Sequence, residues 1–222
     1  MFDEISPTYD MLNHVFSMRQ DLRWRRKAIK KLNELEPSYK NILDLAAGTG
    51  DLTVELNKLS PNHLFAVDIS LEMLKINREK MKSSQVHFVK ADALHLPFND
   101  NYFNLIGISF GIRNFEYLDK GLKEMRRVLD TNGKFLTIEM FRNPSKNFVL
   151  KSFLFYFNKI VPRIGNLLSR SKYAYNYLFR SVETFLSIDE YSKLLNENGF
   201  KLIYQKNNFL GIVHTVIAEK IS

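Results

Sequence analysis

The sequence predicts an α/β protein with a doubly wound, mostly parallel sheet of seven strands. The first observation is the run 41–51, where a short apolar strand leads into two glycines one residue apart and then into an acidic residue at the start of a helix. The second is that three successive strands end in Asp44, Asp68 and Asp92, each 24 residues after the last. Successive βα units need a spacing of this order, and ligands of such sheets bind where the strands end. We therefore expect a ligand site at that edge.

The strands are recognised as short apolar runs bounded by turn residues. They are expected at residues 41–45, 63–67, 86–90, 104–110, 134–140, 201–208 and 211–220. The helix after the glycine corner is expected at 51–59. The order is five βα units, a helical insertion, one more helix and a closing pair of strands, the last of them antiparallel. Right-handed crossovers place helices on both faces of this sheet.

Start and stop signals mark the other helices. Ser70 and Asp119 are expected to cap the helices after the second and fourth strands. Residues 187–190, Ser-Ile-Asp-Glu, form a capping box for a later helix. That helix ends where Gly199 is expected to take the left-handed conformation. Residues 130–133, Asp-Thr-Asn-Gly, predict a turn that leads into the fifth strand.

The composition is that of one enzyme domain covering residues 1–222. Hydrophobic residues make up 45% of the chain, enough for a sizeable core. There is no cysteine, which excludes disulfides, zinc–thiolate centres and cysteine nucleophiles. The first residues lack the basic and apolar regions of a secretory leader, and no apolar run approaches the roughly 18 residues of a membrane span. We therefore expect a cytoplasmic protein.

Basic residues gather in two places. Residues 1–40, ahead of the sheet, are expected to be helical, and their run 23–27, Arg-Trp-Arg-Arg-Lys, is interpreted as a solvated face of the helix. The second place is the segment 140–182, which contains eight lysines and arginines, ten aromatic residues and no acidic residue. It carries the whole net charge of +8, because the rest of the chain has 24 basic and 24 acidic residues.

The glycine corner favours a cationic ligand over a pyrophosphate. Gly48 and Gly50 place no Cβ between a ligand and the backbone. A dinucleotide site needs a third glycine three residues further on, and Thr53 occupies that position. Asp51 stands at the helix N-terminus, where it would repel the phosphates that such a terminus attracts. An adenosine that carries a sulfonium, S-adenosylmethionine, is the ligand that fits this pattern.

The chain resembles the ubiquinone/menaquinone biosynthesis C-methyltransferase family, within the class I S-adenosylmethionine-dependent methyltransferases. The resemblance covers nearly the whole chain, and its most specific motif is the hexapeptide 109–114, Ser-Phe-Gly-Ile-Arg-Asn. Other matching blocks are 2–3, 9–13, 43–51, 93–98, 162–165, 175–178 and 211–214. Ala47 departs from the family, which often has Gly or Cys there. The resemblance implies a Rossmann-like fold.

The resemblance also implies a set of cofactor-binding residues. They are Thr49, Asp68, Asp92, Ala93 and Ser109. Gly48 and Gly50 would admit the methionine portion, and Asp44 would offset positive charge beside it. A carboxylate at the end of the second strand suits the ribose hydroxyls, and Asp92 can accept from the adenine amino group beside Ala93. Two alternatives stay open: Asp44 only stiffens the corner, and Ser109 is a buried hydroxyl.

For substrate, the resemblance implies the reduced ring of a polyprenylated quinone, such as demethylmenaquinol. Arg113 is the first candidate for stabilising phenolate charge, and Asn114 for orienting the ring hydroxyl. Tyr9, Asp10 and His214 are candidates for proton handling. The alternatives are a structural salt bridge for Arg113 and a hydrogen-bonded strand histidine for His214. We expect no metal, because no carboxylate–histidine cluster with ligand spacing is visible.

A prenyl tail stays in the bilayer, so the ring must be reached at the membrane surface. Aromatic and basic residues suit an interface with anionic lipids, and residues 141–182 are expected to form a helical lid and a peripheral membrane contact at the inner face of the cytoplasmic membrane. The alternative is a solvated helical cap. A methyltransferase for another lipid, for a small metabolite or for RNA is the rival function; we expect no nucleic-acid partner. The oligomeric state and the choice of quinone stay open.

Overall fold

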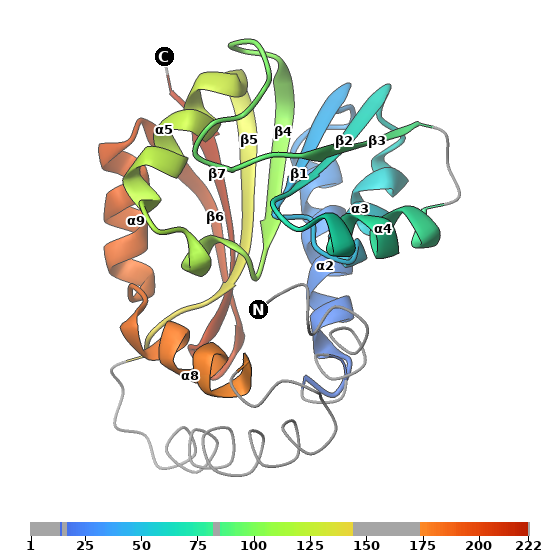
Figure 1. Cartoon of the computed structure of the whole chain (residues 1–222). Helices are drawn as coiled ribbons and strands as arrows, with labels where there is room; N and C mark the ends of the chain where they lie inside the picture. The colour runs from blue at the N-terminus through green and yellow to red at the C-terminus, as the bar shows by residue number, and fades with distance from the viewer. Residues whose placement is uncertain (1–13, 15–16, 82–84, 144–173, 222) are drawn as a thin grey trace.

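The computed structural model describes residues 14, 17–81, 85–143 and 174–221. A single sheet runs through the molecule in the strand order β3-β2-β1-β4-β5-β7-β6 (Figure 1). The strands are β1 (Asn41–Leu45), β2 (His63–Asp68), β3 (Val86–Lys90), β4 (Phe103–Ser109), β5 (Leu129–Met140), β6 (Phe200–Phe209) and β7 (Val213–Lys220). The first five are parallel, and β7 is antiparallel to both of its neighbours. The predicted fold class is confirmed.

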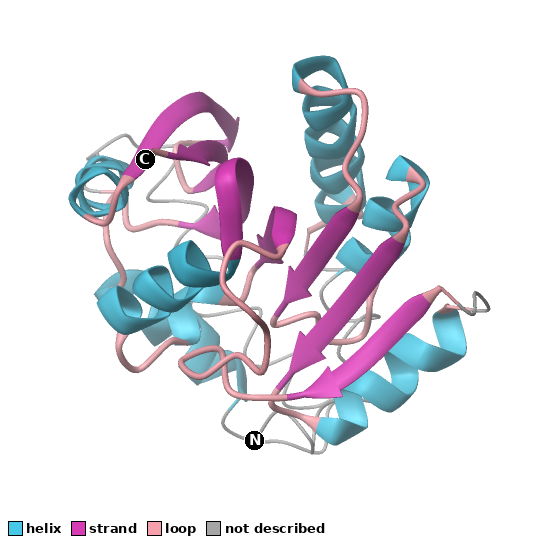
Figure 2. Cartoon of the chain, turned by 90° about the horizontal axis from the view of Figure 1, so that it is seen from above, coloured by secondary structure: helices cyan, strands magenta, loops and turns pink. Residues whose placement is uncertain are grey.

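Helices cover both faces of the sheet, as Figure 2 shows from above. The helices are α2 (Gln20–Leu35), α3 (Asp51–Leu56), α4 (Leu71–Lys80), α5 (Leu118–Val128), α8 (Ala174–Thr184) and α9 (Ile188–Glu197), with the 3-10 turns η1 (Asn57–Leu59) and η2 (Ile112–Asn114). The core is divided accordingly. Residues of α2 and α3 pack with β1 in one cluster, and residues of α5 and α9 pack with β4 and β5 in the other.

Three of the predicted helix-end residues have the expected role. The Ser70 hydroxyl accepts a hydrogen bond from the Met73 N–H at 3.1 Å. Ser187 and Glu190 form the expected capping box, and Gly199 has a φ of 76°. These bonds satisfy backbone groups that a helix end otherwise leaves without a partner.

Two local predictions were wrong. Asp119 lies in the first turn of α5, after the cap residue Tyr117, where its charge still faces the positive end of the helix dipole. The turn at 130–133 lies within β5. Leu129 pairs with Phe103 and Lys134 with Leu105, so the chain bulges out of the ladder between them. A β-bulge keeps a strand in the sheet through an inserted stretch.

The basic, aromatic segment 140–182 is described only at its two ends. Residues 141–143 continue from β5, and α8 begins at Ala174; the expectation of a lid over residues 144–173 lies outside the described residues. In the described part of the chain, no helix has the length and apolar character to cross a bilayer.

Candidate functional site

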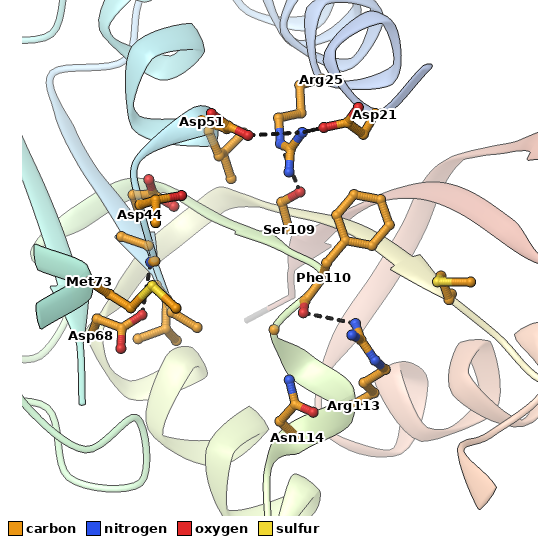
Figure 3. Close-up of a pocket in the computed structure, with 18 of the residues that line it drawn as sticks. Asp21, Arg25, Asp44, Asp51, Asp68, Met73, Ser109, Phe110, Arg113 and Asn114 are labelled. Carbon is orange, nitrogen blue, oxygen red and sulfur yellow. Dashed lines mark hydrogen bonds and ion pairs between the residues drawn. The ribbon is translucent and has the colours of Figure 1, made fainter. Parts of the chain in front are cut away.

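A cavity of about 430 Å³ lies at the carboxyl ends of β1, β2 and β4, where Figure 3 draws its walls. The predicted site residues that line it are Asp44, Gly48, Thr49, Asp68, Asp92, Ala93, Ser109, Arg113 and Asn114. Two predicted residues are not among the lining residues, Gly50 and His214. Residues from four parts of the chain, 44–49, 68–69, 91–94 and 109–116, therefore meet at this cavity, as the spacing of the strand-terminal aspartates predicted.

The two glycines of the corner have different surroundings. Gly48 has a φ of 54°, and a Cβ there would meet nothing within 4 Å, so its position leaves space for a ligand. Gly50 has a φ of 95°, and a Cβ there would collide with Oδ1 of Asn77. Gly50 is therefore needed for packing against α4. A direct ligand contact for Gly50 stays a prediction.

Asp44 stands at the inner wall of the cavity, 1% exposed. Its Oδ2 accepts a hydrogen bond from the Thr53 hydroxyl at 2.5 Å, and that hydroxyl accepts one from the Asn77 amide at 2.8 Å. Among the described residues, Oδ1 has no partner. Burial raises the pKa of Asp44 to about 7, although the Thr53 hydrogen bond and the charge of Arg25 lower it. A cationic ligand would restore the ionised form.

Asp68 is the last residue of β2 and Asp92 follows β3 by two residues, and both accept hydrogen bonds from nearby backbone N–H groups. The carboxylate of Asp68 accepts from the N–H of Gly48 and from the N–H of Ser70, both at 2.8 Å, so it ties the glycine corner to the cap of α4. Asp92 is exposed and accepts from the Leu94 N–H at 2.9 Å. Each carboxylate is thus held in place where it lines the cavity.

Arg25 of α2 is a site residue that the sequence analysis missed. Its side chain is only 9% exposed, so the interpretation of the run 23–27 as a solvated face is wrong for this residue. Nε donates to the Ser109 hydroxyl at 3.2 Å, and Nη1 donates to Asp21 at 2.7 Å. Burial acts to raise the pKa of Asp21, but the hydrogen bonds from Ser17 and Arg25 and the charge of Arg25 outweigh it and lower that pKa.

The sequence does contain a pattern that indicates the burial of Arg25. Asp21, Trp24, Arg25 and Ala28 recur at intervals of three and four, which places them on one face of α2. An acid followed by an arginine four residues later is an ion pair within a helix. An ion pair on the same face as a tryptophan indicates burial, because the tryptophan is on the face that packs.

Arg113 combines a place on the cavity wall with a buried salt bridge. Nη1 donates to Oε1 of Glu139 at 2.6 Å and to the Phe110 carbonyl at 2.8 Å. Nε donates to the Ser181 hydroxyl of α8 at 3.3 Å. The neighbouring Asn114 accepts from the Tyr177 hydroxyl at 3.2 Å. Helix α8 therefore fixes both residues of the hexapeptide that were predicted to act on the substrate.

His214 lies on β7, paired with Glu139 of β5. Its ring packs edge-on against Phe141, with 5.7 Å between centroids, and burial lowers its pKa. Its neighbour Val213 lines the cavity and His214 does not. A role of His214 in proton transfer stays a prediction, although its side chain does not line the cavity.

Among the described residues, one group could present three ligand atoms to a metal ion: His14, Asp21 and Asp51. The Arg25 guanidinium lies between its carboxylates, 2.7 Å from Asp21 and 3.7 Å from Asp51. Lys80 lies 2.9 Å from Asp51 as well. Each of these two acids is therefore already paired with a positive side chain.

The other end of the cavity is apolar. Trp24 packs on Phe110 and on Phe209, with 6.4 Å between ring centroids in each pair. Met140, Ile212 and Val213 line the same wall. Phe110 has a φ of 57°, a conformation that costs about 1–2 kcal/mol for a residue with a Cβ. This strained residue directly follows β4 and lies within the hexapeptide. Backbone strain of this kind is common beside a binding site.

The fold resembles those of solved methyltransferases. A SAM-dependent methyltransferase from Aquifex aeolicus has a TM-score of 0.62 and 17% sequence identity, with 87% of this chain and 89% of that chain covered. The [4+2]-cyclase SpnF has a TM-score of 0.64 and 14% identity, covering 88% and 80%. Identities this low show the shared fold alone, and a cyclase among the matches illustrates why fold does not decide activity.

Sequence comparison is more specific. A demethylmenaquinone methyltransferase from Bacteroides fragilis is 38% identical, with 99% of this chain and 91% of the relative aligned. One from Thermus thermophilus is 40% identical, covering 94% and 95%. The ubiquinone/menaquinone biosynthesis C-methyltransferase UbiE of Campylobacter jejuni is 35% identical, covering 100% and 96%. The profile of the ubiE/COQ5 methyltransferase family matches residues 1–220. The chain therefore belongs to the ubiE/COQ5 methyltransferase family.

Proposed function

We propose that the protein transfers the methyl group of S-adenosylmethionine to a ring carbon of a polyprenylated quinol, converting a demethylmenaquinol to a menaquinol. The observation that carries the proposal is the division of the cavity into an acidic end and an aromatic end. Over the whole cavity, the ionisable lining residues among those described are six acids and two arginines: Asp21, Asp44, Asp51, Asp68, Asp92, Glu116, Arg25 and Arg113. Three of the acids, Asp44, Asp68 and Asp92, come from the strand ends. Such a lining suits a cationic methyl donor next to an apolar ring.

The lining residues at the strand ends suit the groups of the cofactor. The carboxylate of Asp68 at the end of β2 is the partner for ribose hydroxyls. Beside it, Ile69, Met73 and Leu94 line the cavity with apolar surface for a flat base, and Asp92 stands at the edge of that surface. The methionine portion would then extend over Gly48 toward the end of β4. A metal has no part in this proposal.

The aromatic end fits the quinol. Bound S-adenosylmethionine supplies an electrophilic methyl group on its sulfonium. The quinol ring carbon beside the phenolate must lie about 3 to 3.5 Å from that methyl for in-line attack. The carbon forms the new bond while the sulfur takes the electron pair of the broken one, and the ring then loses its proton and becomes aromatic again.

Arg113 and Asn114 are the proposed catalytic residues for this step. An arginine stays protonated in proteins, so Arg113 is a fixed cation that stabilises negative charge on the ring oxygen. Glu139 and α8 hold it in place. The Asn114 side chain orients the ring hydroxyl. Tyr9 and Asp10 lie outside the described residues, and the proton acceptor is proposed to be one of these, His214 or water.

The reaction itself is the test. The purified protein is given S-adenosylmethionine labelled in its methyl group and a short-chain demethylmenaquinone, with and without dithionite to reduce the ring. We expect label in the ring of the reduced substrate only, because the oxidised ring lacks the electron density to attack the methyl group. Label in an unrelated lipid or in RNA, with none in the quinol, would contradict the proposal.

The membrane contact is a separate proposal. Residues 141–182, most of which lie outside the described residues, would bind anionic lipid through their basic and aromatic side chains. One exposed apolar side chain at the cavity supports it, Met18 at 72%. Co-sedimentation with liposomes should rise with the fraction of phosphatidylglycerol. Equal sedimentation with neutral and anionic liposomes would favour a solvated cap.

A further inference from the structure

The cavity contains a buried cation to which the proposed reaction assigns no role. Arg25 reaches the wall from α2 and is anchored at two atoms, Nε on Ser109 and Nη1 on Asp21. Its guanidinium carbon also lies 5.3 Å from the centre of the Phe110 ring. The hydrogen bonds of this guanidinium to other described residues come from Nε and Nη1, which leaves Nη2 with donor capacity at the cavity.

The two arginines of the cavity lie on opposite sides of Phe110 (Figure 3). Arg113 donates to the carbonyl of Phe110 and to a glutamate that is completely buried. Arg25 contacts the ring of Phe110 and the hydroxyl of Ser109, at the end of β4 next to the glycine corner. Arg25 therefore lies between the aromatic end and the glycine corner, next to the place where the proposed function puts the methionine portion.

The amino-acid part of S-adenosylmethionine has one anionic group, its α-carboxylate, and a neighbouring α-ammonium group. We propose that Arg25 binds the α-carboxylate of the cofactor, next to the α-ammonium group that the predicted cofactor residue Asp44 would meet. The inference rests on the proposed function, since it assigns a ligand group within the same cofactor site. It adds a residue from the segment ahead of the sheet to a site otherwise formed by strand ends.

Both partners of this clamp have the chemistry for it. The charge of Arg25 is felt at Asp44, where it lowers a pKa that burial raises, so the two groups lie on the same wall within electrostatic reach. Oδ1 of Asp44 is buried and lacks a partner among the described residues, so an ammonium donor that reached it would satisfy it. Nη2 of Arg25 can donate a charge-assisted hydrogen bond to an oxygen of the α-carboxylate.

The neighbouring acids orient the guanidinium and leave room for the ligand. Asp21, at 2.7 Å, is its close partner, while Asp51 lies 3.7 Å away and has Lys80 at 2.9 Å. The acids around Arg25 are thus balanced by cations before any ligand arrives. The α-carboxylate would then add to a neutral group of charges, where charge-assisted hydrogen bonds remain favourable.

A pair of ligands tests the assignment without turnover. S-adenosylhomocysteine has the amino-acid portion, and 5′-methylthioadenosine has the same adenosine and sulfur without it. The affinities of both are measured by calorimetry for the wild type and for Arg25→Met. We expect S-adenosylhomocysteine to bind the variant about 10- to 100-fold more weakly, the range expected for a charge-assisted hydrogen bond, and 5′-methylthioadenosine to bind with less than a twofold change.

Two further variants complete the design. Arg26→Met removes the next arginine, whose side chain is 63% exposed, and should leave both affinities unchanged. Arg25→Lys retains the charge that Asp21 needs, so it guards against loss of the fold, and should weaken S-adenosylhomocysteine less than Arg25→Met does.

Other outcomes overturn the assignment. Equal weakening of both ligands would make Arg25 a structural residue. Unchanged affinity for S-adenosylhomocysteine with a raised KM for the quinol would assign Arg25 to the substrate. Failure of the proposed function would be visible in the wild type alone. A wild-type protein that binds neither ligand and methylates no quinol would contradict the proposed function, whatever the variants do.

Discussion

Glu139 accepts two hydrogen bonds from Arg113, one from Nη1 at 2.6 Å and one from the backbone N–H at 3.3 Å. Glu139 is completely buried and the Arg113 side chain is 6% exposed. The salt bridge was an alternative to a catalytic role for Arg113, yet the structure combines it with a position on the cavity wall. A buried carboxylate that holds a cation in one orientation is a means of presenting fixed charge to a substrate.

Glu139→Gln should lower the free energy of unfolding by about 3 kcal/mol, because it leaves the buried guanidinium without its counter-charge. Urea denaturation measures the difference. The matched control is Asp119→Asn, which breaks the exposed pair of Asp119 with Lys123 and should change stability by less than about 1 kcal/mol. Equal effects of the two variants would show that burial does not strengthen the Glu139 pair.

Arg113→Lys should lower kcat for quinol methylation at least tenfold while the affinity for S-adenosylhomocysteine stays unchanged. Lysine retains the charge for Glu139 but lacks the planar set of donors that also reaches Phe110 and Ser181. Steady-state kinetics with calorimetry separates the two effects. Turnover at the wild-type rate would remove Arg113 from the proposed mechanism.

Tyr177→Phe should reduce kcat by up to about tenfold, the equivalent of one neutral hydrogen bond. The lost bond is the one to Oδ1 of Asn114 at 3.2 Å, which holds the amide in place. Binding of S-adenosylhomocysteine, at the other end of the cavity, serves as the internal control. An unchanged kcat would mean that α8 does not position Asn114 for the reaction.

Asp44 should make stability depend on pH in a direction opposite to that of most carboxylates. Burial raises its pKa to about 7, so the folded state holds a proton that the unfolded state releases near pH 4. The contribution of this proton to the stability of the folded state is full below pH 4, and it is lost as the pH rises to 7. The Tm of Asp44→Asn minus that of the wild type should therefore increase between pH 5 and pH 8.

The same proton gives a binding test. A cationic ligand favours ionised Asp44, so binding of S-adenosylmethionine near pH 6 should release a proton, measured as a dependence of the calorimetric enthalpy on the ionisation enthalpy of the buffer. Asp44→Asn should remove that release. A difference in Tm that does not vary with pH would place the pKa of Asp44 near its ordinary value.

Gly50→Ala should destabilise the protein more than Gly48→Ala. Both glycines have positive φ, which costs an alanine about 1–2 kcal/mol. At Gly50 the new Cβ also displaces Asn77 and its hydrogen bond to Thr53, so the total loss should reach about 2–4 kcal/mol. Urea denaturation of the two variants compares them directly, and equal losses would show that Asn77 moves aside freely.

The sequence alone predicted the sheet, because strand periodicity and capping residues are local signals that each element contains within itself. The aspartates at strand ends were predicted to converge since parallel βα units bring those ends to one edge. Asp44, Asp68, Asp92 and Ser109 all line the cavity accordingly. The family resemblance then supplied the candidates in the hexapeptide, where Arg113 and Asn114 also lie on its wall.

Only the tertiary structure decided which charges are buried and what they contact. Arg25 and Arg26 are neighbours in one basic run, yet Arg25 enters the cavity and Arg26 lies outside, because only one helix face packs against the sheet. His214 follows Val213, but alternation along β7 turns its side chain away from the cavity wall. Packing between elements distant in the chain sets such differences, and no local pattern encodes the partner that a side chain will meet.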